Sequence, residues 1–305
     1  MERIPLDEVR DRTYKTRDSW WTVLLVDPVA SRLTRWIAPY RWFTPNRITM
    51  LGFLVGLTAA AFFALGGVRE NNWWLVAGAL AYHVSFVLDC IDGKIARLNG
   101  TGSVFGAWLD YVFDRLRIVA CTIALMGGQY AATKSIVYLV LGGLVIFLDM
   151  FRYLNALENA KVNRELKTQL EEAGLAPKPL PRTAVASDET DPDRLSMLAM
   201  VDNSTVGLGV FHRMRTALRR SRIRPHLVGG IEFQMAVFII APVVGAIVPV
   251  TLAAAGLMVL FELALIYMLY QGSAAVARQL ATARHGAIPA QRTPVAEPEP
   301  VAART

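Results

Sequence analysis

Six long apolar stretches constrain this chain of 305 residues more than any other feature of its sequence. A helix needs about 20 apolar residues to cross the hydrocarbon core of a bilayer. Helices are also the open-chain structure that satisfies every backbone polar group in lipid. The stretches are Ile48–Gly67, Trp73–Asp92, Val104–Met126, Ser135–Leu154, Leu227–Val248 and Thr251–Gln271. The sequence therefore predicts an all-α integral membrane protein with six transmembrane helices.

The hydrophobic content is typical of a membrane protein, and the position of the basic residues indicates which molecules the protein binds. Hydrophobic residues make up 54% of the chain and the mean hydropathy is +0.36, whereas soluble domains average about 45–50% apolar residues. The net charge is +7, and a basic balance suits nucleic acid, anionic lipid or phosphorylated substrates. Because the basic residues flank apolar stretches, we expect membrane lipids as partners, and no nucleic acid.

The loop charges predict how the chain is oriented in the cell membrane. Two connections that fall on one side, Gly127–Thr133 and the turn at Pro249, carry no charge. The basic residues of the other side are Lys15, Arg32, Arg35, Arg41, Lys94, Arg97, Arg278 and Arg284, together with those of the connection 152–226. Basic loops stay in the cytoplasm. We therefore expect a multi-pass protein with both termini in the cytoplasm.

An interfacial amphipathic helix is predicted just before the first span. Asp27-Pro28 suits an N-cap followed by the first helical residue. Apolar side chains then recur at helical spacing, at Val29, Leu33, Trp36, Ile37 and Tyr40. Such a helix lies in the headgroup plane, and a buried helix of a soluble protein is the alternative.

These features divide the chain into three parts. A cytoplasmic N-terminus with the interfacial helix covers residues 1–47, and the membrane domain covers 48–275. The membrane domain carries a cytoplasmic insertion at about 157–226, whose part 158–173 has helical composition and whose part 211–224 is basic and amphipathic. We expect the basic part to bind anionic headgroups, with substrate capture as the alternative. Residues 276–305 form the third part, a cytoplasmic tail that we expect to be disordered.

Four aspartates inside two neighbouring spans are the strongest functional signal. A charge at the centre of a span costs about 2.5–3.5 kcal/mol on insertion scales, so such residues occur mainly where they act or pair. Asp89 and Asp92 are three residues apart, and Asp110 and Asp114 are four apart. Both spacings place a pair on one helix face.

The two pairs are expected to meet at one depth, near the cytoplasmic surface, because a short loop joins their antiparallel helices. Hard divalent cations prefer carboxylate oxygen ligands. We therefore predict a site for a divalent cation, Mg²⁺, Mn²⁺ or Ca²⁺, that faces the cytoplasm. A structural ion-pair network is one alternative, with Arg97, Arg115, Arg117 or Arg152 as its cations. A proton relay in a transporter is another, although the sequence contains no paired repeats of the kind transporters use.

The aspartates belong to a longer pattern, which reads Asp89-x2-Asp92-Gly93-x2-Ala96-Arg97-x8-Gly106-x3-Asp110-x3-Asp114. At every position and spacing it resembles the signature of the CDP-alcohol phosphotransferase family. The segment Thr44-Pro45-Asn46-Arg47-Ile48-Thr49 also resembles the Pro-Asn-x-x-Thr segment that opens the first span in this family. The family pattern of an interfacial helix and six spans covers about residues 25 to 275.

The resemblance implies transfer of a phosphate-linked alcohol from a CDP-alcohol to a second alcohol, with release of CMP. Asp89, Asp92 and Asp110 would ligate one or two divalent ions. Asp114 would be the general base that takes the acceptor's hydroxyl proton, and would also touch a metal ion. The donor-binding residues that the resemblance implies are Asn46, Thr49, Asp89, Gly93, Ala96, Arg97 and Gly106. Family members are commonly homodimers, so a homodimer is expected.

Fewer residues of the sequence indicate the identity of the acceptor alcohol. Arg115 directly follows Asp114, as in family members that use inositol phosphate, but residues 150–155 do not resemble the basic motif of those enzymes. We favour CDP-diacylglycerol as donor and a small polyol or polyol phosphate as acceptor, in phospholipid biosynthesis. The alternative delivers a CDP-activated small alcohol to a lipid.

Further polar residues carry weaker hypotheses. Arg152, with Arg117 or Arg224, is predicted to bind a phosphate of the acceptor, and snorkelling of Arg152 to lipid phosphate is the alternative. His83 is expected to be a packed histidine. Glu232 is a candidate for the acceptor cavity, and Glu262 is expected to be paired at a helix or subunit contact.

Overall fold

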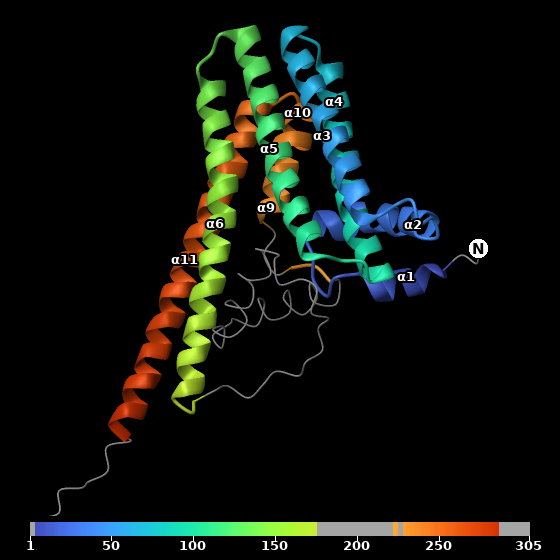
Figure 1. Cartoon of the computed structure of the whole chain (residues 1–305). Helices are drawn as coiled ribbons and strands as arrows, with labels where there is room; N and C mark the ends of the chain where they lie inside the picture. The colour runs from blue at the N-terminus through green and yellow to red at the C-terminus, as the bar shows by residue number, and fades with distance from the viewer. Residues whose placement is uncertain (1–3, 176–221, 225–227, 287–305) are drawn as a thin grey trace, which may run out of the picture.

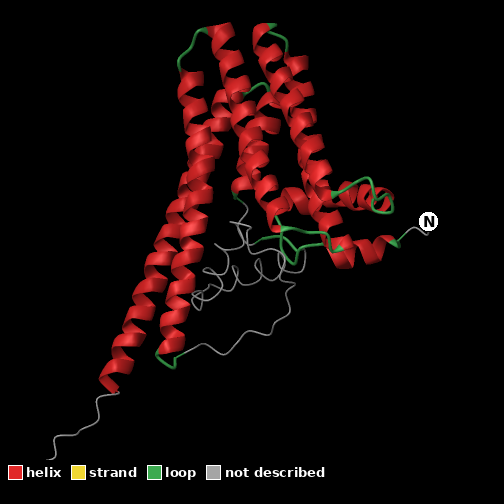
Figure 2. Cartoon of the chain, viewed as in Figure 1, coloured by secondary structure: helices red, strands yellow, loops and turns green. Residues whose placement is uncertain are grey.

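The computed structural model describes residues 4–175, 222–224 and 228–286, and within them the chain is helical (Figure 2). The prediction of an all-helical protein is thus confirmed for these residues, whose one extended pairing is a bridge between Asp18 and Ile223. The elements are α1 (Leu6–Thr13), the π-helical turn η1 (Thr22–Val26), α2 (Asp27–Ile37), α3 (Pro45–Val68), α4 (Asn72–Asn99), α5 (Val104–Thr133), α6 (Val137–Glu172), α9 (Gly230–Met235), the π-helical turn η2 (Ala236–Ile240), α10 (Ala241–Val244) and α11 (Ile247–Gly286).

Four of the described helices are long and apolar enough to cross a membrane: α3, α4, α6 and α11. The helix α5 has 30 residues, but its first half carries Asp110, Asp114, Arg115 and Arg117. The apolar segment Gly230–Val244 is shorter than a full span. Length and composition therefore support a membrane protein, with four spans by this criterion instead of the six predicted.

The helices α3, α4 and α5 form the tightly packed part of the fold. α3 and α4 are joined at the upper end in Figure 1, as are α5 and α6, and α3 packs against both α4 and α5. Gly67 on α3 meets Gly128 on α5, where a Cβ atom on Gly67 would lie 2.1 Å from the backbone carbon of Gly128. This contact needs glycine, and it holds α5 directly against α3.

The helices α6 and α11 are longer than predicted and run past the lower ends of the other helices (Figure 1). The helical composition predicted for residues 158–173 is confirmed, since α6 continues to Glu172. Residues 276–286, expected as the first part of a disordered tail, continue α11 instead. Alanine, arginine, glutamine and leucine dominate this segment and favour helix. Residues 287–305 lie outside the described part.

The helix α2 lies crosswise near the lower ends of α3 and α4 and contacts both α4 and α1 (Figure 1). The prediction that Asp27 caps its N-terminus is wrong, because α2 continues directly from η1 and has no free first turn there. The Asp27 carboxylate is buried and pairs with Lys94 Nζ at 2.7 Å and with Arg222 Nη2 at 3.2 Å. Asp27 therefore fastens α2 to the lower end of α4.

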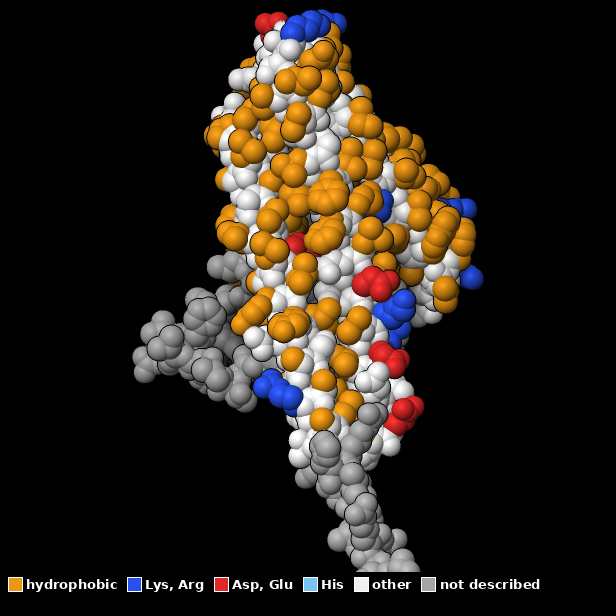
Figure 3. Space-filling model, turned by 90° about the vertical axis from the view of Figure 1, so that its left-hand side faces the viewer, with side chains coloured by type: hydrophobic (Ala, Val, Ile, Leu, Met, Phe, Trp, Pro, Cys, Tyr) orange, Lys and Arg blue, Asp and Glu red, His pale blue; other side chains and the backbone are white. Residues whose placement is uncertain are grey.

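The small side chains of α2 face the protein and its large apolar side chains face outward. Ala30 and Thr34 are fully buried, whereas Leu33 is 41% and Trp36 61% exposed. On the face drawn in Figure 3, apolar side chains are spread over most of the upper part below a charged tip, and charged side chains become frequent again towards the lower end. Such a surface suits contact with lipid above and with water below.

Candidate functional site

A tight connection between α4 and α5 sets the register of the two aspartate pairs. α4 ends at Asn99 and is capped by Gly100, whose φ of +64° is in the left-handed region that glycine adopts easily. α5 begins at Val104, and the Oγ of its N-cap residue Ser103 accepts a hydrogen bond from the Gly106 backbone N–H at 3.0 Å. This short connection places the last turns of α4 and the first turns of α5 at the same end of the molecule, where both helices pack against α3.

The structure brings the four predicted aspartates into electrostatic range of one another. Asp89 interacts with both Asp110 and Asp114, and Asp92 interacts with Asp89, Asp110 and Asp114. Asp92 is 4% exposed, and the side chains of Asp89 and Asp114 are 18% and 23% exposed. So many carboxylates at close range repel one another strongly unless cations lie among them.

The first turns of α3 reach the same place. The Thr49 hydroxyl donates to Asp92 Oδ2 at 2.5 Å, which fixes the orientation of that carboxylate. Asn46 is exposed one turn earlier, and its Oδ1 lies 2.9 Å from where a Cβ atom on Gly106 would stand. Glycine at 106 therefore lets the Asn46 side chain lie against α5 beside the aspartates.

Two arginines of α5 already contact the cluster. Arg117 Nη2 is 2.5 Å from Asp114 Oδ1, and its Nη1 is 3.6 Å from Asp89 Oδ1. Arg115 Nη2 is 3.9 Å from Asp114 Oδ2. The ion-pair network that the sequence offered as an alternative is thus partly present, with Arg117 at its centre.

The carboxylate oxygens of the cluster are suitable ligands for a hard divalent cation, although the side chains do not form a complete coordination site. Among the described residues, no group of three or more His, Cys, Asp or Glu is arranged to hold a metal ion. One carboxylate oxygen, Asp110 Oδ1, is buried and makes no hydrogen bond. A buried oxygen of this kind is a natural ligand for Mg²⁺ or Mn²⁺.

The predicted nucleotide-binding residues of α4 lie on its last two turns. Gly93 and Ala96 are partly exposed, and a Cβ atom on Gly93 would meet only Arg97, at 3.5 Å, an ordinary contact. Packing within the described chain therefore does not require glycine at 93. Arg97 Nε donates to the Thr13 carbonyl at 3.0 Å, which ties the end of α4 to α1.

Arg152 lies at the contact between α6 and α11. It is 1% exposed, and its Nε is 3.2 Å from Glu262 Oε1. This burial is not the snorkelling arrangement that was the alternative, and the predicted helix contact of Glu262 is confirmed. Arg224 is buried too, with Nη2 3.8 Å from Asp18 Oδ1.

Two weaker candidates lie away from this contact. His83 is half-buried against the Trp21 ring, with centroids 6.0 Å apart, as expected for a packed histidine. Glu232 is partly exposed in the first turn of α9. The basic stretch at 211–221 of the insertion lies outside the described residues.

One further aspartate inside a predicted span, Asp149, was missed by the sequence reasoning. Asp149 on α6 is 1% exposed, pairs with Arg115, and accepts a hydrogen bond from Gln234 Nε2 at 2.9 Å. Arg115 also stacks on the Tyr153 ring, 3.5 Å from its centroid. The signal was available, since Asp149 is an ionisable residue inside a predicted span.

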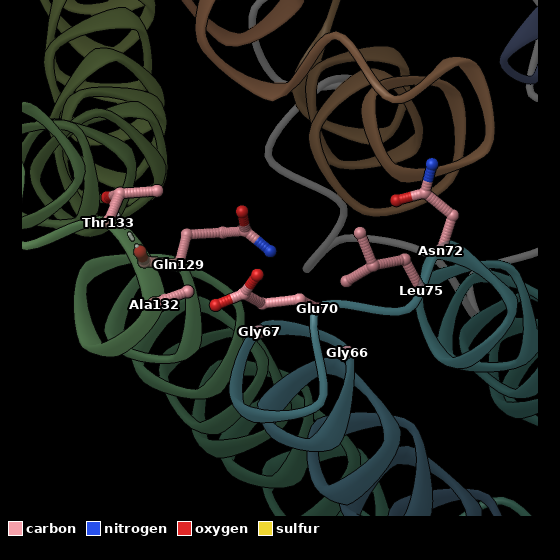
Figure 4. A pocket seen from close by; sticks show the side chains of 8 residues that line it. All are labelled: Gly66, Gly67, Glu70, Asn72, Leu75, Gln129, Ala132 and Thr133. Carbon is pink, nitrogen blue, oxygen red and sulfur yellow. Dashed lines mark hydrogen bonds between the residues drawn. The ribbon is translucent and has the colours of Figure 1, made fainter.

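A separate polar pocket opens at the other end of the helices, near the α3–α4 connection (Figure 4). Its volume is about 270 Å³, and the side chains of Glu70 and Gln129 point towards each other across it. It is lined by Gly66, Gly67, Glu70, Asn72, Leu75, Gln129, Ala132 and Thr133. None of the four aspartates contributes to this pocket.

Comparison with known proteins identifies the part of the chain that carries the site. Residues 42–175 match the family described as CDP-alcohol phosphatidyltransferase. An Aquifex aeolicus protein named bifunctional IPC transferase and DIPP synthase is 40% identical over 85 residues, which are 26% of this chain and 17% of that protein.

Two archaeal proteins, both named archaetidylinositol phosphate synthase, are also similar. The Pyrococcus horikoshii protein is 41% identical over 24% of this chain and 35% of its own length. The Methanothermobacter thermautotrophicus protein is 28% identical over 40% of this chain and 54% of its own length. The match thus spans at most about half of each of these relatives. All four aspartates lie within residues 42–175, the segment that matches the CDP-alcohol phosphatidyltransferase family.

Proposed function

We propose that this protein transfers a substituted phosphate group from a CDP-alcohol to the hydroxyl of a second alcohol and releases CMP. The observation that carries the proposal is the clustering of Asp89, Asp92, Asp110 and Asp114 within the segment that matches the family. The relatives named as synthases and transferases of phospholipids support a place in phospholipid biosynthesis.

The aspartates divide the chemistry between them in this proposal. Asp89, Asp92 and Asp110 would hold one or two Mg²⁺ or Mn²⁺ ions, and these ions would supply Lewis-acid stabilisation of the phosphate charge. Asp114 contributes to the same ligand set and takes the proton from the acceptor hydroxyl, since an alcohol is a poor nucleophile without a positioned base.

The donor nucleotide lies against the last turns of α4 and the first turn of α3. Gly93 and Ala96 leave space for cytidine, and the space around Gly93 supports this assignment. Arg97 offsets phosphate charge. The remaining contacts come from Asn46, Thr49 and Gly106, which lie around Asp92 and α5.

The favoured donor is CDP-diacylglycerol and the favoured acceptor is a small polyol or polyol phosphate. The archaetidylinositol phosphate synthases and a phosphatidylinositol phosphate synthase among the relatives support a polyol phosphate. The reversed assignment, a CDP-activated small alcohol transferred to a lipid, has its own support in relatives named cholinephosphotransferase and ethanolaminephosphotransferase.

We also propose the membrane arrangement that this reaction needs. α5 and the segment Gly230–Val244 cross the bilayer together with the four long apolar helices, which makes six spans. α2 lies in the interface with its exposed apolar face in lipid. Both termini and the aspartates face the cytoplasm, where a water-soluble substrate meets a lipid, and two copies form a homodimer.

The experiment is a substrate panel with two arms. Purified full-length protein in lipid nanodiscs receives CDP-diacylglycerol and Mg²⁺ with glycerol phosphate, inositol phosphate, serine or inositol, and the lipid product is identified by mass. The parallel arm offers CDP-glycerol, CDP-inositol or CDP-ethanolamine with lipid acceptors. Product in the first arm supports the favoured assignment. Product in the parallel arm alone reverses it, and CMP release in neither arm contradicts the proposed activity.

A further inference from the structure

Arg117, which the sequence offered as a partner of Arg152 in binding the acceptor's phosphate, lies inside the aspartate cluster. Its guanidinium bridges two helices, because Asp114 is on α5 and Asp89 is on α4. The arginine side chain is 3% exposed, and a buried charge is unfavourable unless it is paired and hydrogen-bonded. The ion pairs with Asp89 and Asp114 therefore offset the free-energy cost of burying the Arg117 charge.

The surrounding helices form a cradle shaped for this side chain. The Ser85 hydroxyl donates its proton to the Gly52 carbonyl at 2.7 Å, so its oxygen is left to accept from Arg117 Nη1 at 3.1 Å. The Tyr82 ring lies under the guanidinium, 5.7 Å from ring centroid to Cζ. Both contacts come from α4, on the same side as Asp89.

The third wall of the cradle is Gly56 on α3. A Cβ atom at this position would lie 2.6 Å from Cδ of Arg117 and 2.7 Å from its Cγ. Such distances are too short for carbon atoms, so only glycine leaves room for the stem of the arginine. Three helices thus cooperate to hold one cation between two carboxylates.

We propose that Arg117 is a built-in counter-cation that competes with a divalent metal ion for the Oδ1 atoms of Asp89 and Asp114. This inference rests on the proposed function, because it assumes that these aspartates bind Mg²⁺ or Mn²⁺. Arg117 keeps the two carboxylates paired in the substrate-free protein. It has to leave them when a metal ion binds, both because the oxygens are shared and because like charges repel.

Competition of this kind raises the concentration of metal ion that is needed to occupy the site. Loss of the guanidinium frees two carboxylates and removes a positive charge from the site. Hydrogen bonds to charged groups are strong enough that Arg117→Met is expected to tighten metal binding by about tenfold or more. A purely structural arginine gives the opposite result, since its loss disorders the aspartates and weakens binding.

The test measures Mn²⁺ binding to full-length protein in nanodiscs, without nucleotide, from the electron paramagnetic resonance signal of free Mn²⁺. Arg117→Met is compared with wild type. Gly56→Ala is the second variant, because it displaces the stem of Arg117 and leaves every carboxylate unchanged. Gly143→Ala is the matched control, since a Cβ atom at Gly143 meets nothing within 4 Å.

We expect Arg117→Met and Gly56→Ala to lower the Mn²⁺ dissociation constant and Gly143→Ala to leave it unchanged. If wild type binds Mn²⁺ and neither Arg117→Met nor Gly56→Ala binds it more tightly, the inference about Arg117 is wrong and the proposed metal site stands. If wild type, Arg117→Met and Gly56→Ala all fail to bind Mn²⁺, the metal site of the proposed function and the inference fail together.

Discussion

The guanidinium of Arg152 on α6 is buried against the carboxylate of Glu262 on α11, with Nε 3.2 Å from Oε1. The two side chains are 1% and 3% exposed. Asn155, one turn further along α6, donates to the other Glu262 oxygen at 2.5 Å. This cluster joins the two longest helices near the point where they run past the rest of the molecule.

Arg152→Ala is expected to destabilise the protein, because it leaves the Glu262 carboxylate buried without its cation. Removal of one partner of a buried ion pair costs about 3–5 kcal/mol. The thermal unfolding temperature in detergent should fall, and the double variant Arg152→Met with Glu262→Leu should recover most of it. An unchanged unfolding temperature with a raised acceptor KM would instead favour the acceptor-phosphate role for Arg152.

Thr49→Val should weaken metal binding, because the lost hydroxyl no longer orients the Asp92 carboxylate. Loss of a partner that orients a metal ligand typically costs about 10–100-fold in affinity. Thr49→Ser keeps the hydroxyl and is the matched control. Mn²⁺ titration of the substrate-free protein measures both variants, and equal affinities for valine and serine would refute the role given to Thr49.

Asp149→Asn should lower turnover as well as stability. Asp149 forms an ion pair with Arg115. The Nη2 of Arg115 is also 3.9 Å from Oδ2 of the proposed base Asp114. Without the charge of Asp149, Arg115 is free to turn towards Asp114 and to make it a weaker base. CMP release and thermal unfolding are measured together, and Asp149→Glu should restore turnover. A normal kcat with lowered stability would leave Asp149 a purely structural residue.

Much of this site could be predicted from local spacing. Asp89 with Asp92, and Asp110 with Asp114, share helix faces because of their separations in sequence, and the short connection between the helices places the pairs together. The motif that contains them was sufficient to indicate the family. Even the pairing of Arg117 with Asp114 is a contact between residues three apart on one helix.

The remainder depends on contacts between residues far apart in sequence. Asp27 has the sequence of a helix cap, yet it pairs with Lys94, 67 residues away. Glu262 meets Asn155 across 107 residues. The cradle of Arg117 needs Gly56 from a different helix, and nothing in the local sequence shows which glycine faces an arginine. Helix packing decides these partners, so periodicity along one helix does not reveal them.

The most direct measurement of the central claim is CMP release by the purified full-length protein, with and without divalent metal, for wild type, Asp114→Asn and Asp89→Asn. Chelation should abolish release by wild type, and Mn²⁺ or Mg²⁺ should restore it. Asp114→Asn should lose most turnover and retain CDP-alcohol and Mn²⁺ binding better than Asp89→Asn does. Full activity without metal, or equal loss of nucleotide affinity in both variants, would contradict the account.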